Sequence, residues 1–195
     1  MTDRETLYTG AGRAAWGYFF LYLDINLGSL NILPDWGAYL LFLSAIRLLV
    51  GERRDLGLLR PLGILLAVWH GADWALALFG GGVSGLWAPA DVVIGVVQMY
   101  FHFQLLTDCA ALAAAHQGPG ETVDRRLLRW RTVQTVLMTA VLCCSYGAEW
   151  LPETVAETAL TLMALAYLVA GLCVMFAVFA LRRIFQGDEA PGTAG

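Results

Sequence analysis

Residues 87–116 decide the fold. Their sequence is WAPADVVIGVVQMYFHFQLLTDCAALAAAH, a long and mainly apolar run that opens on Pro89 and Asp91. A helix needs about 20 mainly apolar residues to cross a hydrocarbon core about 30 Å thick. The run is continuous rather than alternating, and a sheet that spans a membrane would have to close into a barrel. The stretch therefore predicts a transmembrane helix.

Similar runs recur along the whole chain. They predict an all-α, polytopic transmembrane bundle of six helices, at residues 10–27, 35–51, 61–79, 87–116, 127–149 and 153–185. We expect one transmembrane domain over residues 1–186 and a disordered tail over 187–195. No small-x-small cleavage site follows the first apolar run, so we do not expect a signal peptide.

The composition supports this class of protein. Of 195 residues, 58% are hydrophobic before the 21 glycines are counted, and 14% are charged. A soluble domain averages about 45–50% apolar residues with glycine included, and about 25% charged residues. The net charge of −4 excludes a nucleic-acid binder, which needs an excess of basic surface. A disordered chain is excluded by the high apolar content.

The basic residues predict one orientation. All twelve are arginines, and they fall in four places: Arg4 and Arg13; Arg47, Arg53, Arg54 and Arg60; Arg125, Arg126, Arg129 and Arg131; Arg182 and Arg183. The other three connections, which follow the first, third and fifth predicted helices, contain acids and no arginine. The positive-inside rule then places both termini inside, with three outward hairpins. The absence of lysine beside abundant Ala, Gly and Arg suggests a GC-rich bacterial genome, hence the bacterial cytoplasmic (inner) membrane.

Polar residues form a stripe on the fourth predicted helix. Asp91, Gln98 and His102 stand at i, i+7 and i+11, within an arc of about 40° on a helix. The third helix carries His70 and Asp73 at i, i+3 and runs antiparallel to the fourth. We expect the fourth helix to be central and surrounded by protein. We expect four of these side chains to converge in the outer half of the bilayer, with Asp91 at the mouth: His70, Asp73, Gln98 and His102.

Three interpretations of this cluster stay open. The residues can be interhelical hydrogen bonds that hold the bundle together. They can line a polar cavity or a proton path, in which an Asp–His pair passes a proton. His70, Asp73 and His102 are also candidate ligands of a divalent metal ion, although H-x-x-D is by itself an unspecific motif.

The first outer hairpin holds a second candidate group: Asp24, Asn26, Asn31 and Asp35. An acid near a helix C-terminus, as Asp24 is predicted to be, is electrostatically unfavourable and calls for a donor or a bound cation. The four cysteines all lie in predicted helices without a C-x-x-C pair, which favours packing roles over a redox or zinc motif.

This hairpin resembles the N-terminal signature of a family of small multi-pass membrane proteins of Gram-positive bacteria. The family pattern is D-x-N, a short turn, I-L-P-D and then Gly-Tyr. Here Asp24-Ile25-Asn26 and Ile32-Leu33-Pro34-Asp35 match, and Ala38-Tyr39 replaces the last pair. The resemblance covers about 25 of the 195 residues. It implies a membrane protein and no particular activity.

From these observations we expect a small transport-related or ligand-binding membrane component with an outward-facing polar pocket. Its size and layout look like the substrate-binding components of bacterial vitamin uptake systems, which work with an energising partner complex. The alternative is a non-catalytic membrane scaffold or assembly partner. No H-E-x-x-H or G-x-S-x-G motif occurs, which favours a non-enzyme without establishing it. No catalytic residue or cofactor is predicted. The expected partners are the lipid bilayer, a small polar solute, a proton or a cation, and a protein partner or second copy.

Overall fold

A computed structural model describes residues 3–23, 26–27, 30–31, 35–79, 81, 88–147 and 153–186. Six α-helices carry the fold: α1 (Arg4–Tyr22), α2 (Asp35–Leu49), α3 (Leu59–Ala77), α4 (Ala88–His116), α5 (Val123–Gly147) and α6 (Glu153–Ile184). A short 3-10 helix, η1 (Arg54–Leu58), precedes α3. Two antiparallel strands of two residues each, β1 (Asn26–Leu27) and β2 (Leu30–Asn31), follow α1.

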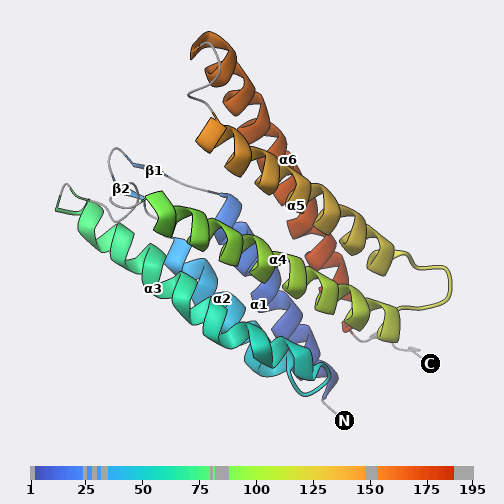
Figure 1. The fold of residues 1–195 in the computed structure, drawn as a ribbon. Helices are drawn as coiled ribbons and strands as arrows, with labels where there is room; N and C mark the ends of the chain where they lie inside the picture. The colour runs from blue at the N-terminus through green and yellow to red at the C-terminus, as the bar shows by residue number, and fades with distance from the viewer. Residues whose placement is uncertain are drawn as a thin grey trace, which may run out of the picture.

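The helices alternate in direction around a ring. Each helix packs against the next one along the chain, and α6 closes the ring against α1. Both chain ends therefore lie at the same end of the bundle, while α5 and α6 reach beyond the other helices at the opposite end (Figure 1). The short turn between α4 and α5 lies at the end that holds the termini. It contains Gly120, whose φ of 91° suits a glycine. The sequence Gly118-Pro119-Gly120 is typical of such a tight turn.

The core is rich in aromatic side chains. Tyr18 of α1, Tyr39 and Phe42 of α2, and Phe101 of α4 are fully buried where these helices meet. Their rings meet mostly edge to face, with Tyr18 and Phe42 4.9 Å apart between centroids, a favourable aromatic arrangement. Small residues on α1 let its neighbours approach: a Cβ on Gly17 would lie 2.6 Å from the Phe42 ring.

The helix boundaries confirm the second, fourth and sixth predicted helices most closely. α2 begins at Asp35, α4 at Ala88 and α6 at Glu153, where an acid or a proline suits the first turn. The first prediction is displaced, because α1 begins at Arg4 and ends at Tyr22. Its first turns are helical because they pack against neighbours, with Leu7 buried in the common core.

Two of the described helices are long and apolar enough to cross a membrane. They are Pro89–His116 of α4 and Glu157–Ile184 of α6. Two such helices suggest a membrane protein only weakly, because a core helix of another protein class passes the same test. Two of the other helices show why they do not meet this criterion of length and apolar content. Helix α2, with 15 residues, is about 22 Å long. Helix α5 carries four arginines near its start.

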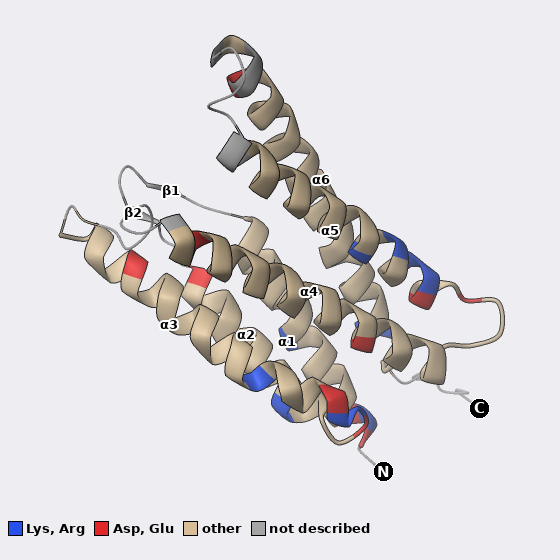
Figure 2. Ribbon diagram, viewed as in Figure 1, with Lys and Arg blue, Asp and Glu red and all other residues tan. Residues whose placement is uncertain are grey.

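The arginines gather in the half of the bundle that contains both termini, as Figure 2 shows. The opposite half carries acids, among them Asp35, Asp73 and Asp91. The charge asymmetry of the sequence is thus an asymmetry between two ends of the fold.

Candidate functional site

The centre of the bundle holds His102, whose side chain is 1% exposed. Its Nδ1 lies 3.3 Å from the Tyr18 hydroxyl, and its Nε2 lies 3.5 Å from the Tyr39 hydroxyl. A neutral imidazole has one donor and one acceptor nitrogen. One phenol therefore donates to the ring while the other accepts from it, and the histidine ties α4 to both α1 and α2.

Aromatic rings enclose this histidine. Phe101 and Phe42 meet the imidazole edge to face at 5.4 Å and 5.6 Å between centroids. We call His102 with Tyr18, Tyr39, Phe42 and Phe101 the His102 cluster. Both ring nitrogens of His102 are engaged and the surroundings are apolar, so the cluster has the properties of a packed and internally bonded core.

Three of the predicted pocket residues, His70, His102 and Gln98, do not share one set of neighbours. The His70 ring stacks on Tyr39, 5.3 Å between centroids and 11° between planes, so it joins the outer edge of the His102 cluster. Its Nδ1 lies 3.7 Å from Asp35 of α2, which was expected in the outer hairpin group instead. Asp73 follows His70 on α3, and Asp91 lies in the first turn of α4. Gln98 lies on α4 as well, but it lines a cavity between α4, α5 and α6.

The cavity that Gln98 lines is partly open to the surroundings. It has a volume of about 230 Å³ and lies between α4, α5 and α6. Its lining residues are Gly95, Gln98, Met99, Met138, Val141, Leu142 and Tyr167. We call it the α4–α5–α6 cavity. Gln98 stands about 10 Å along the helix from Asp91, so the cavity is in the half of the bundle away from the arginines.

A buried polar group lies next to this cavity. The amide of Gln134, on α5, donates to the Tyr22 hydroxyl of α1. Tyr167 of α6 interacts with both of these side chains, and its ring meets that of Tyr22 edge to face at 5.6 Å. Tyr22 in turn stacks on Tyr18 at 6.1 Å. Aromatic contacts therefore connect the cavity to the His102 cluster.

The threonines near the cavity bond mainly to their own helices. The hydroxyls of Thr135 and Thr139 donate to the carbonyls of Arg131 and Thr135, four residues back. Thr139 also lies 3.3 Å from the sulfur of Met99, which joins α5 to α4. These hydroxyls therefore add little polarity to the cavity.

Sequence reasoning missed most of the cavity lining. Residues 95, 98 and 99 on α4 and residues 138, 141 and 142 on α5 share the spacing i, i+3, i+4. That spacing marks one face of a helix, so it is a usable signal. It does not reveal that the two faces meet each other. Tyr18, Tyr39 and Tyr167 were missed because isolated tyrosines in apolar helices carry no motif.

The metal candidates do not gather. Among the residues that the structure describes, no group of three or more His, Cys, Asp or Glu side chains is placed to hold a metal ion. His70, Asp73 and His102 therefore form no such group. Of the outer hairpin candidates, Asn26 and Asn31 are paired between the two strands, and Asp24 lies outside the described residues, as does the tail at 187–195.

The expectation of a central fourth helix is only partly met. Gln98, His102 and Cys109 face the interior, with His102 and Cys109 fully buried. The opposite face is open, because Val93, Val96 and Tyr100 are exposed. The ring arrangement explains this: each helix, α4 included, has an inner and an outer face.

Towards the end of the bundle that holds both chain termini, α4 carries a buried acid. Asp108 is 1% exposed, accepts a hydrogen bond from Gln104 at 3.1 Å, and lies 3.8 Å from the guanidinium of Arg53. The neighbouring Arg131 donates to Thr107 at 3.0 Å and covers the Phe103 ring at 4.3 Å. These contacts fix Arg53, which directly precedes η1, and Arg131 of α5 to α4.

Comparisons of this chain with protein-family models, curated proteins and solved structures find no match.

Proposed function

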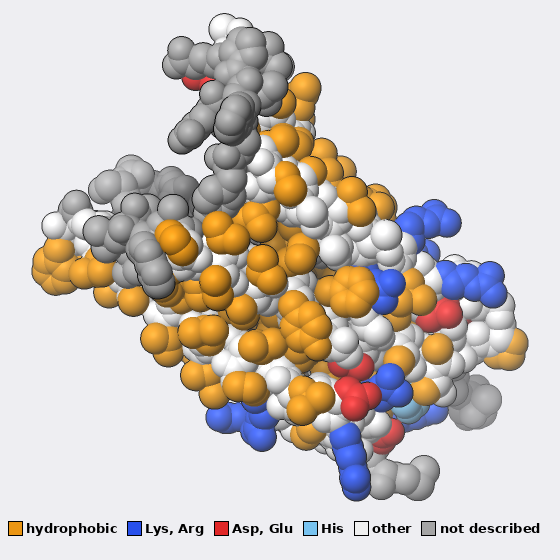
Figure 3. All heavy atoms as spheres, in the orientation of Figure 1, with side chains coloured by type: hydrophobic (Ala, Val, Ile, Leu, Met, Phe, Trp, Pro, Cys, Tyr) orange, Lys and Arg blue, Asp and Glu red, His pale blue; other side chains and the backbone are white. Residues whose placement is uncertain are grey.

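We propose that this chain is a six-span protein of the bacterial inner membrane, with both termini in the cytoplasm, that acts as a ligand-binding or transport-related component. The observation that carries the proposal is a girdle of exposed apolar side chains on all six helices. It includes Trp16, Leu40, Ile64, Val68, Val93, Val96, Val136, Leu162, Leu165 and Phe176. Figure 3 displays one face of this girdle, with the basic side chains below it and to its right.

A girdle of this extent has one straightforward explanation. Monomeric soluble proteins rarely expose contiguous apolar patches larger than a few hundred Å². Lipid chains cover such a surface at no cost, and the arginines at one end match the positive-inside rule. The shorter helices then span together with α4 and α6, because their outer faces belong to the same girdle.

The α4–α5–α6 cavity supports the ligand-binding part. Ligand sites in helical proteins commonly lie between helices, and they combine an apolar wall with a few polar groups. The cavity has this composition, with Gln98 and Tyr167 as its polar groups.

A specific observation favours the second candidate, a membrane scaffold. The His102 cluster binds its own polar atoms internally, as interhelical hydrogen bonds of a purely structural core do. The two functions differ in the cavity, which a scaffold does not use.

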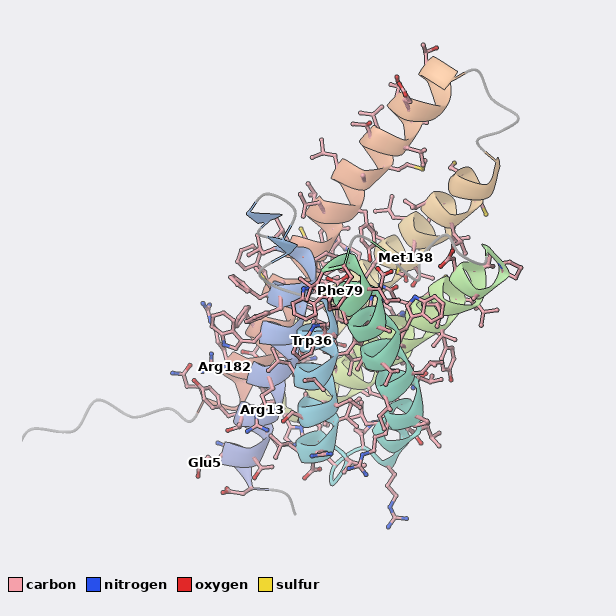
Figure 4. All side chains as sticks on the ribbon, turned by 90° about the vertical axis from the view of Figure 1, so that its left-hand side faces the viewer. Glu5, Arg13, Trp36, Phe79, Met138 and Arg182 are labelled. Atoms are coloured by element: carbon pink, nitrogen blue, oxygen red, sulfur yellow. The ribbon has the colours of Figure 1, made fainter. Side chains whose placement is uncertain are left out.

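Cysteine labelling tests the topology. In a background without the four native cysteines, we would introduce Phe79→Cys at the outer end of α3, Arg54→Cys in η1, and Val136→Cys in the middle of α5. Phe79 is 88% exposed, and Figure 4 places it at the end of its helix. In intact spheroplasts, a charged maleimide should label Phe79→Cys only. Arg54→Cys should react after permeabilisation, and Val136→Cys only after denaturation.

The three sites discriminate between the possible results. A soluble helical protein would stay out of the membrane fraction, and all three cysteines would react together. Labelling of Arg54→Cys in intact spheroplasts would reverse the proposed orientation. Either result overturns the proposal.

A further inference from the structure

The polar groups of the α4–α5–α6 cavity are neutral. Gln98 contributes an amide and Tyr167 a phenol, while the other five lining residues are glycine, methionines and branched aliphatics. None of these seven described lining residues carries a formal charge at neutral pH. An ion moved in beside them would be desolvated without an opposite charge among them to replace its hydration, which is strongly unfavourable.

The size of the cavity limits its occupant. A cavity of 150 Å³ lined by aliphatic and aromatic side chains is known to bind benzene. At about 230 Å³, this cavity is roughly half as large again, which suits one small ring system. Met99 on α4 and Met138 on α5 both line the cavity. Methionine side chains are flexible and polarizable, so the wall adapts to the shape of the occupant.

Helices α4 and α5 approach each other closely at one edge of the cavity. A Cβ on Gly95 of α4 would lie 3.1 Å from Cδ1 of Leu142 on α5. Thr139 joins the same two helices by its contact with Met99. The packed contact between α4 and α5 therefore bounds the cavity on this side, and the cavity is partly open to the surroundings elsewhere.

We infer that the α4–α5–α6 cavity binds a small, uncharged and mainly apolar molecule with one hydrogen-bonding group, which Gln98 or Tyr167 recognises. This deepens the proposed function and rests on it. It names a neutral ligand in place of the polar solute, proton or cation expected from the sequence, because the two histidines of the predicted pocket, His70 and His102, lie in or beside the His102 cluster instead.

The test uses the full chain in lipid nanodiscs and 5-fluoroindole as the probe. Indole is a bicyclic ring with a single N–H donor. Its fluorinated form reports binding by ¹⁹F line broadening, and empty nanodiscs correct for partitioning into lipid. We expect saturable broadening that unlabelled indole reverses. Indene, which has the same shape without the N–H, should compete about fivefold less well, as expected for one neutral hydrogen bond.

Two variants locate the site. Gln98→Leu keeps the bulk of the side chain and should weaken indole binding about fivefold while leaving indene unchanged. Met138→Trp should fill the cavity and abolish saturable binding; Figure 4 marks Met138 on α5. Val136→Trp is the matched control, because Val136 lies on the same helix and is 61% exposed. It should bind as the unmodified chain does.

Each outcome has a defined meaning. Absence of saturable binding, or binding that survives Met138→Trp, overturns the inference. Equal competition by indole and indene overturns the hydrogen-bonding part and indicates a purely apolar occupant, such as a lipid chain. Saturable binding by a charged analogue, indole-3-acetate, as tight as that of indole overturns the neutral selectivity. Since the labelling pattern is measured separately, a correct topology without binding rejects this inference and leaves the six-span proposal standing.

Discussion

Nδ1 of His102 lies 3.3 Å from the hydroxyl of Tyr18, and the two side chains join α4 to α1 in the centre of the bundle. The same imidazole reaches Tyr39 of α2 through Nε2. His102 thus joins α4 to two helices whose contacting tyrosines lie 84 and 63 residues earlier in the sequence. In an apolar interior, a polar group that keeps its partners stabilises the packing, and one that loses them is costly.

Replacement of His102 by leucine should lower stability. His102→Leu fills a similar volume and leaves Tyr18 and Tyr39 without this partner. An unsatisfied buried polar group costs about 1–3 kcal/mol, and each kcal/mol shifts the melting midpoint by about 2–4 °C in a chain of this size. We expect a drop of roughly 2–12 °C in detergent, measured by circular dichroism.

A double-mutant cycle makes this prediction specific. Tyr18→Phe should also lower the midpoint, and the double variant should lose less than the sum of both changes, by at least about 0.5 kcal/mol. Tyr100→Phe on the exposed face of α4 is the control and should change little. If His102→Leu melts like the unmodified chain, the hydrogen bonds have no structural role.

Much of the fold could be predicted because its signals are local. The helix starts at Asp35, Ala88 and Glu153 follow from prolines and acids in first turns. The start of α1 could not be predicted in this way. Residues 4–9 contain charged and polar side chains, and their helix depends on tertiary contacts such as the bond from Arg182 of α6 to Tyr8.

The candidate site was only partly predictable. The stripe with Gln98 and His102 does face inward, as helical periodicity indicates. The two residues nevertheless have different surroundings, because His102 faces α1 and α2 while Gln98 faces α5 and α6. Helix rotation and the order of helices around the ring decide this, and neither is encoded in the spacing along one helix.

A glycine pair tests the packing of α6 on α1. A Cβ on Gly171 would overlap the ring of Tyr22, whereas a Cβ on Gly37 of α2 meets no described atom within 4 Å. Gly171→Ala should lower stability by about 1–3 kcal/mol, as overpacking does. Gly37→Ala should leave it unchanged or raise it by up to about 1 kcal/mol, because alanine favours helix. Equal melting midpoints for the two variants would contradict the close approach at Gly171.

The ion pair between Arg53 and Asp108, in the half of the bundle that holds both chain termini, should contribute modestly to the free energy of unfolding. Arg53 lies 3.8 Å from the buried carboxylate of Asp108 but is itself 40% exposed, so solvent screens the attraction. Arg53→Gln should cost about 1 kcal/mol or less, and 1 M NaCl should reduce the difference. Arg54→Gln, at an exposed neighbour, should have no effect. A salt-independent loss, or equal losses in both variants, would rule out this contribution of the pair.

A single charged residue introduced on the exposed apolar girdle distinguishes a membrane protein from a soluble one. Val136 lies near the middle of α5 and is 61% exposed, so it faces lipid if the six-span proposal holds. Aspartate at the centre of a spanning helix costs about 2.5–3.5 kcal/mol, and valine and aspartate have similar helix propensities. Val136→Asp should therefore reduce the amount of folded protein in the membrane fraction, measured by fluorescence-detected gel filtration. Gln186→Asp makes the same change of charge after α6, in the terminal half, and should have no effect. In a soluble bundle, Val136→Asp would be tolerated or would improve solubility, the opposite direction.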